Sequence, residues 1–235
     1  MWIKICGNQT LADLQPSIAD AADAVGFVFA PSIRRVNMAQ ISEIMPTLPD
    51  DVTAVGVFNT QNFDEIRSAL RSGGLHGVQL HGELDFALAE KLRREFGAGL
   101  FLIQTLHWDL TRDPARAEET LRNELRAIGR HNDIDAVLLD SRNASASGGT
   151  GQPLDWERAR DVTGAEAGNM RIILAGGLNP QNVAQAIQTV KPWGVDVSSG
   201  VEQYPGKKDP ARVRAFIEAA RTAFAAIENK HLVPQ

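Results

Sequence analysis

The chain has little of several features that define whole classes of protein. It contains one cysteine among 235 residues, which excludes an internal disulfide framework and indicates a reducing compartment. No apolar run approaches the ~20 residues of a membrane span, and no basic and apolar leader precedes Lys4. The net charge of −5 argues against a general nucleic-acid binder. We therefore expect a cytoplasmic protein that binds neither nucleic acid nor membrane.

Short β-branched runs alternate eight times with longer amphipathic stretches. Strict alternation of this kind predicts parallel strands joined by crossover helices, and the chain length suits one (β/α)8 barrel. We therefore predict a single domain over residues 1–235, with the TIM-barrel fold. The expected strands are 2–6, 24–29, 53–58, 77–81, 100–106, 136–140, 171–175 and 195–198.

Two connecting segments carry readable helix signals. Asn179-Pro180 is typical of a helix start, with an N-cap followed by proline at the first helical position. Residues 112–131 are rich in Arg and Glu and predict a long, solvated fifth helix.

Two polar side chains end apolar strands, and they suggest a reacting pair. Cys6 ends the first strand and Asp140 ends the sixth. In barrels of this type, catalytic groups lie at the C-terminal ends of strands. A thiolate can act as a base, and a partly desolvated carboxyl with a raised pKa can act as an acid. The alternatives are a buried structural cysteine and an aspartate that caps a helix or turn.

Strand alternation also predicts a charged pair inside the barrel. If Cys6 points inward, so does Lys4, and Asp196 shares its face with Ser198 on the eighth strand. Because the eighth strand neighbours the first in a closed barrel, Lys4 and Asp196 can meet. They form either a purely structural ion pair or a pair whose lysine also stabilises a Cys6 thiolate.

Loops after the seventh and eighth strands predict a phosphate site. Gly176 and Gly177 follow the seventh strand, and Ser198 and Ser199 end the eighth. These two loops form the recurrent phosphate cradle of such barrels, where glycine lets backbone N–H groups approach the anion. The alternative is that the glycines only make tight turns.

The remaining candidates have weaker support. The loop 141–151, with Gly149 and Gly151, either closes over a substrate or is a plain linker. Arg35 is either a carboxylate ligand or an ordinary surface residue. Gln79 and His81 share a face of the fourth strand, and His81 either lines the pocket or is structural. We predict no metal site, because the other histidines lack suitable spacing: His76, His107, His131 and His231.

Together these residues resemble the phosphoribosylanthranilate isomerase family of tryptophan biosynthesis. The matching segments occur in the family's order over nearly the whole chain: KICG (4–7), GFVFAP (26–31), VQLHG (78–82), LLDS (138–141), GGTG (148–151), LAGGLNP (174–180), DVSSGVE (196–202) and PGKKD (205–209). The resemblance implies a barrel enzyme without cofactor or metal that performs an acid/base-catalysed Amadori rearrangement of an aminoaldose phosphate. It implies a monomer or weak homodimer.

On the family pattern, Cys6 is the general base and Asp140 the general acid. Arg35 matches the arginine that holds the anthranilate carboxylate, and the glycine and serine loops match the phosphate site. The chain departs from the pattern at Asn8-Gln9, at 32–34 and at Gln104, which bears on the shape of the anthranilate pocket. Two rival readings are the related aminoaldose isomerase of histidine biosynthesis and a non-catalytic sugar-phosphate-binding barrel.

Overall fold

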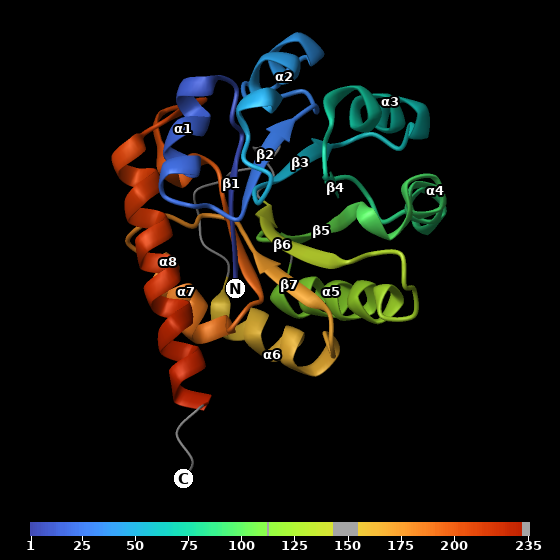
Figure 1. Cartoon of the computed structure of the whole chain (residues 1–235). Coiled ribbons are helices and arrows are strands. Elements are labelled where there is room, and N and C mark those ends of the chain that lie inside the picture. Colours follow the sequence, from blue (N-terminus) through green and yellow to red (C-terminus); the bar gives the residue numbers. More distant parts are fainter. Residues whose placement is uncertain (112, 143–154, 232–235) are drawn as a thin grey trace.

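Eight parallel strands form a closed barrel, each hydrogen-bonded to the next, with β8 returning to β1 (Figure 1). The computed structural model describes residues 1–111, 113–142 and 155–231. The barrel strands are β1 Trp2–Cys6, β2 Ala24–Val28, β3 Thr53–Phe58, β4 Gly77–Leu80, β5 Phe101–Asp109, β6 Ala136–Arg142, β7 Arg171–Leu174 and β8 Gly194–Val197. The predicted barrel is therefore confirmed.

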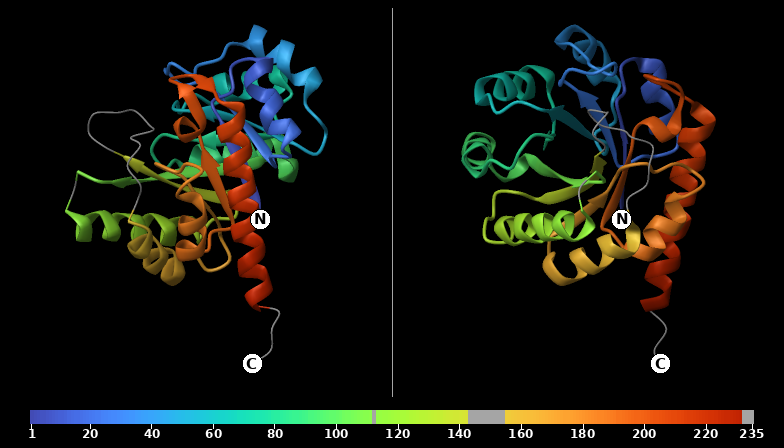
Figure 2. Two further views of the ribbon diagram at one scale, coloured as in Figure 1. Left: turned by 90° about the vertical axis from the view of Figure 1, so that its left-hand side faces the viewer. Right: turned by 180° about the vertical axis from the view of Figure 1, so that it is seen from behind.

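Helices surround the barrel, and α8 runs alongside α1 and α7 (Figure 2). The helices are α1 Leu11–Ala19, α2 Met38–Ile44, α3 Phe63–Gly73, α4 Phe86–Phe96, α5 Pro114–Ile128, α6 Trp156–Glu166, α7 Val183–Val190 and α8 Pro210–His231. The short elements are the 3-10 turns η1 Met45–Thr47, η2 Gly97–Gly99 and η3 Ser199–Val201, and the hairpin strands β9 Glu202–Tyr204 and β10 Lys207–Lys208. Among the described residues, no helix combines the length and apolar character that crossing a bilayer demands.

Alternation along the strands divides the buried residues between the barrel interior and the helix layer. One apolar cluster, which includes Trp2, Ile103 and Leu138, fills the lower interior. Neighbours of opposite parity, such as Ile3 and Leu139, pack instead against the helices. The interior above the apolar layer is polar, and the reacting groups predicted from the sequence lie on the same inward face.

β5 and β6 are longer than the sequence predicted. Their ladder continues until Asp109 pairs with Arg142, whereas we expected the strands to end at 106 and 140. Trp108 explains part of the extension, because it is buried in the cluster that contains α5 residues such as Leu121. The extension brings His107 into register with Asp140.

The predicted helix start at Asn179-Pro180 is wrong. α7 begins at Val183, after Asn182. The Asn179 side chain instead accepts hydrogen bonds from the backbone N–H groups of Gln181 and Asn182, at 2.9 and 3.1 Å. An asparagine can close a short turn as readily as it caps a helix. In both cases its side-chain oxygen accepts hydrogen bonds from backbone N–H groups two or three residues later in the chain.

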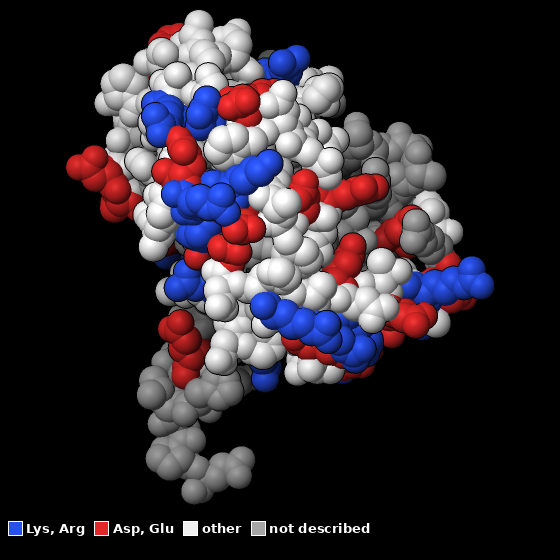
Figure 3. Space-filling model, turned by 90° about the vertical axis from the view of Figure 1, so that its right-hand side faces the viewer, with Lys and Arg blue, Asp and Glu red and all other residues white. Residues whose placement is uncertain are grey.

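The helix layer carries charges of both signs. Figure 3 shows the side with α3 and α4, where acidic and basic side chains are intermixed. Arg71 of α3 pairs with Glu95 of α4, and Arg94 pairs with Glu90 one turn away. Exposed pairs of this kind contribute ~0–1 kcal/mol each. This surface therefore needs no functional explanation.

Candidate active site

A cavity of about 770 Å³ opens at the C-terminal ends of the barrel strands. Its walls include many of the side chains that the sequence singled out: Cys6, Gln79, His81, Asp140, Ser198 and Ser199. A cavity of this size suits a small organic substrate. The thiol and the carboxyl thus share one concave site, although they are far apart in the chain.

Cys6 lies at the rim end of β1, against a glycine of the neighbouring strand. Its side chain is only 7% exposed. A methyl group at Gly26 would come within 2.6 Å of the Cys6 Sγ, so the thiol occupies the space that any larger residue there would fill. Burial raises the pKa of the Cys6 thiol, and the nearby Lys4 and Lys208 only partly offset this effect. This balance favours the protonated thiol over the thiolate at neutral pH.

The predicted meeting of Lys4 and Asp196 is confirmed. The Lys4 Nζ lies 2.9 Å from the Asp196 carboxylate and 2.9 Å from Gln79 Oε1. Gln79 in turn donates to Thr105 Oγ1 at 3.0 Å. Burial alone would lower the pKa of Lys4, but Asp196 and Cys6 together outweigh it, so the pKa is raised and the lysine stays charged. Of the two alternatives for this pair, the effect on the thiol is present: Lys4 lowers the pKa of Cys6, yet less than burial raises it.

These opposing effects give a testable protonation state for the thiol. Because the chain has one cysteine, the thiolate absorbance near 240 nm reports Cys6 alone once the Cys6→Ser spectrum is subtracted. We expect the thiolate to appear only at a pH above the ~8.5 midpoint of a free cysteine. A midpoint at or below that value would contradict the dominance of burial. Lys4→Met should move the midpoint further upward, because it removes the cation that favours the thiolate.

Asp140 lies in the interior of the sixth strand and is 9% exposed. Burial raises its pKa to about 7, the Asp196 charge adds to this, and the Ser141 backbone and Lys4 oppose it. Within β6 it caps no helix. A carboxyl with such a pKa can hold and release a proton near neutral pH, as a general acid must.

A second glycine lies directly against this carboxyl. Gly176 has a φ of 77°, and a methyl group there would come within 2.5 Å of the Ser141 backbone nitrogen and 2.9 Å of an Asp140 oxygen. The loop after β7 therefore buttresses the acid. Gly176 and Gly177 are not among the residues that line the cavity, whereas Ser198 and Ser199 are.

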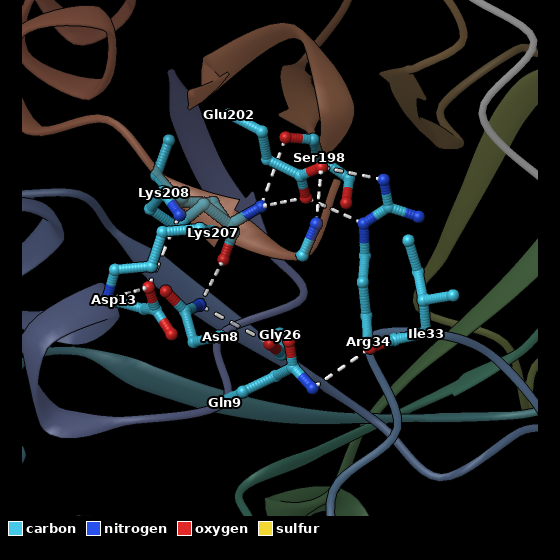
Figure 4. A network of polar contacts seen from close by, with 12 residues as sticks. Asn8, Gln9, Asp13, Gly26, Ile33, Arg34, Ser198, Glu202, Lys207 and Lys208 are labelled. Carbon is cyan, nitrogen blue, oxygen red and sulfur yellow. Dashed lines mark hydrogen bonds and ion pairs between the residues drawn. The ribbon is translucent and has the colours of Figure 1, made fainter. Parts of the chain in front are cut away.

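A buried ionic cluster lies next to the serine turn, formed by Arg34, Glu202 and Lys208 (Figure 4). The Arg34 guanidinium binds Glu202 with two hydrogen bonds, of 2.6 and 2.8 Å. Lys208 Nζ lies 3.1 Å from Glu202 and donates to the Ser198 carbonyl at 3.0 Å. Burial would raise the pKa of Glu202, but its two cations hold that pKa below its usual value. Two cations and one carboxylate leave this corner of the site positive.

The structure separates two neighbouring arginines that the sequence could not distinguish. Arg34 lines the cavity, whereas Arg35 is exposed and is not a lining residue. No periodic pattern holds in this loop, so Arg35 was selected only by its residue type and by the resemblance.

Two of the departures from the family pattern lie away from the cavity wall. The Asn8 side chain donates to the backbone carbonyls of Ile5 and Gly26, at 2.8 and 3.3 Å. Gln104 is buried and donates to the Gly82 and Thr105 carbonyls. Neither residue lines the cavity. Gly149 and Gly151, together with the rest of the predicted loop up to 151 from residue 143, lie outside the described residues.

The sequence missed His107, which lines the cavity beside His81. One nitrogen from each ring and one Asp140 oxygen all lie within 4.8 Å of one another, so these three side chains could hold a metal ion. Strand alternation places His107 on the same inward face as Thr105, and this pattern could have predicted its position in the cavity. We missed it because we expected the strand to end at 106.

The comparisons with known proteins agree with this geometry. A family profile described as "N-(5'phosphoribosyl)anthranilate (PRA) isomerase" matches residues 3–219. The N-(5'-phosphoribosyl)anthranilate isomerase of Rubrobacter xylanophilus is 38% identical, over 94% of this chain and 98% of the relative. The crystal structure of the Thermotoga maritima phosphoribosyl anthranilate isomerase has a TM-score of 0.80 and 34% identity, covering 94% of this chain and 99% of that one.

A further solved structure has a ligand in its name. It is a phosphoribosyl anthranilate isomerase in complex with reduced 1-(o-carboxyphenylamino)-1-deoxyribulose 5-phosphate, with a TM-score of 0.74 and 33% identity. It covers 94% of this chain and 99% of its own. Since the profile spans nearly the whole barrel and the relatives match almost end to end, this chain belongs to the N-(5'-phosphoribosyl)anthranilate isomerase family.

Proposed function

We propose that this chain converts N-(5'-phosphoribosyl)anthranilate into 1-(2-carboxyphenylamino)-1-deoxy-D-ribulose 5-phosphate, an isomerisation of tryptophan biosynthesis. The observation that carries the proposal is the placement of a lone thiol and a carboxyl with a pKa of about 7 on the wall of one cavity. The family membership supplies the substrate. The chemistry is an acid/base-catalysed Amadori rearrangement.

The reaction needs one proton donor and one proton acceptor. The carboxyl of Asp140 protonates the ring oxygen of the ribose, and the bond from that oxygen to C1′ breaks. The anthranilate nitrogen supplies the electron pair, which gives a Schiff-base cation. The cation makes the proton on C2′ acidic, and the Cys6 thiolate removes it to give an enolamine. Tautomerisation then yields the ketone. Each placed proton transfer contributes roughly 10²–10⁴ in rate.

The protonation states of the two groups limit the active fraction of the enzyme. The competent form holds the proton on Asp140 and none on Cys6. Because the pKa of Cys6 is raised and that of Asp140 is about 7, the form with the proton on sulfur is favoured before the substrate binds. The two forms have the same net charge, so pH does not change their ratio. Substrate contacts that favour the thiolate therefore raise the rate.

The positive corner of the cavity suits the phosphate of the substrate. Ser198 and Ser199 line the cavity there, next to the cluster of Arg34, Glu202 and Lys208. Gly176 and Gly177 allow the tight turn after β7, in the loop that neighbours the serine turn after β8. Charge-assisted hydrogen bonds from such groups favour an anion strongly. On the family pattern, Arg35 binds the anthranilate carboxylate, with Gln79, His81, Gly149 and Gly151 as further substrate contacts.

The direct test is a fluorescence assay on freshly made N-(5'-phosphoribosyl)anthranilate. We expect the fluorescence of this anthranilate derivative to fall when the purified protein is added, at a rate proportional to protein concentration. Product identity is checked by chromatography against reduced standards. Substrate binding without turnover would instead support the non-catalytic barrel. Turnover of only the histidine-pathway aminoaldose phosphate would support the related isomerase.

A further inference from the structure

Three metal-binding side chains meet at one side of the cavity mouth. His81 follows β4, His107 belongs to β5 and Asp140 belongs to β6. Their candidate donor atoms lie within 4.8 Å of one another. His107 and Asp140 are direct partners across the β5–β6 ladder, and the two imidazole rings lie edge to face with centroids 4.8 Å apart. Three adjacent strands therefore bring two imidazoles and a carboxylate together.

We propose that His81, His107 and Asp140 form a binding site for a borderline-soft divalent cation, with Zn²⁺ as the best fit. Two imidazoles and one carboxylate are a three-ligand set that Zn²⁺ uses in open sites, where a water takes the fourth position. Bonds of ~2.0–2.2 Å in tetrahedral geometry place donor atoms roughly 3.5 Å apart. Both histidines are half-buried and line the open cavity, so rotation of their side chains can close the remaining gap.

A backbone contact holds one ring nitrogen of His107. Its Nε2 lies 3.0 Å from the carbonyl oxygen of His81. A ring nitrogen that donates its hydrogen to a carbonyl leaves the other nitrogen with the lone pair that a metal needs, and metal-bound histidines commonly have such a partner. The ligands also come from a rigid part of the fold, because two of them lie within paired strands and the third directly follows one.

Occupation of this site would inhibit the reaction. A carboxylate oxygen bound to a dication no longer carries a proton, so Asp140 could not protonate the ribose oxygen. This consequence rests on the proposed function, whereas metal binding itself does not. The site would therefore act as a reversible block, and substrate and metal would compete for the same end of the cavity.

Calorimetric titration of the metal-free protein with Zn²⁺ tests the binding. We expect one Zn²⁺ per chain, and at least ~100-fold weaker binding by His107→Ala. A Co²⁺ titration should give visible absorption bands typical of low-coordinate cobalt, without the near-ultraviolet band of a cobalt–thiolate bond. His131→Ala is the matched control, because it removes an exposed histidine that stacks on Phe86 and does not line the cavity. It should bind Zn²⁺ as the unaltered chain does.

A Cys6→Ala variant separates this site from simple capture of metal by the thiol. We expect it to bind Zn²⁺ unchanged. Loss of binding in Cys6→Ala, or unchanged binding in His107→Ala, would overturn the proposed ligand set. Thermal melts of each variant without metal check that it is folded.

The activity assay then tests the inhibitory role. Zn²⁺ should reduce turnover, a chelator should restore it, and Mg²⁺ at the same concentration should have little effect, because Mg²⁺ prefers oxygen ligands. Zn²⁺ should no longer lower the turnover of His107→Ala, measured against the activity of the same variant without metal. Binding with no loss of turnover would refute the inhibitory role. A chain that binds Zn²⁺ but never turns over substrate would refute the proposed function and leave the metal site standing.

Discussion

Cys6→Ala and Asp140→Asn are each expected to lower kcat by about 10²–10⁴-fold, with a much smaller change in substrate affinity. Each change removes one proton transfer and leaves the phosphate corner at Ser198 and Ser199 intact. Steady-state kinetics give kcat, and binding of the reduced product analogue gives the affinity. Near-full activity in either variant would show that the role given to that residue is wrong.

A conservative change separates chemistry from shape at position 6. Cys6→Ser keeps a small polar side chain but replaces the thiol with a hydroxyl that hardly ionises in water. We expect it to be as inactive as Cys6→Ala. If serine restored most of the activity, a polar contact rather than a thiolate base would explain the need for cysteine. Asp51→Asn, at an exposed position, is the control for loss of a carboxylate.

Asp140→Asn should also make the protein more stable at high pH. Because burial raises the pKa of Asp140 from 3.8 to about 7, the folded state binds this proton more tightly than the unfolded state. The ionised carboxylate then destabilises the fold as pH rises from about 4 to 7, and by up to ~4 kcal/mol above that range. Removing the charge removes the penalty. Activity and stability thus oppose each other at this residue.

Urea unfolding at pH 5 and pH 8 measures this effect. The advantage of Asp140→Asn in unfolding free energy should grow by about 2–3 kcal/mol between the two pH values. The exposed control Asp51→Asn should give the same difference from the unaltered chain at both. A pH-independent advantage would mean that the introduced asparagine packs better and that burial of the charge is not the cause.

Much of the site follows from two regular patterns in the sequence. One is the alternation of inward and outward residues along each strand, and the other is the alternation of strands and helices along the chain. Strand alternation placed Lys4 and Cys6 on one face and predicted contact with Asp196, and the closed barrel then brought β8 to β1. The same reasoning placed Asp140 at the cavity. These predictions worked because a parallel barrel leaves each strand residue only two directions, inward or outward.

The gaps fall where no periodicity applies. That Arg34 lines the cavity and Arg35 does not depends on the path of a loop, and the ion pair between Arg34 and Glu202 joins residues far apart in the chain. Asn179 closes a turn where it looked like a helix cap. The part of Gly26 in seating the Cys6 thiol was also invisible, because a glycine in a strand does not show which side chain occupies its space.

The ion pair that closes the barrel has a consequence for synthesis of the protein. Lys4 and Asp196 are 192 positions apart, so the ribosome completes the second long after the first. At ~5–20 residues per second, the nascent chain carries Lys4 without its carboxylate partner, beside its only cysteine, for roughly 10–40 s. A truncated product that stops before β8 would therefore contain both reacting groups and still be inert.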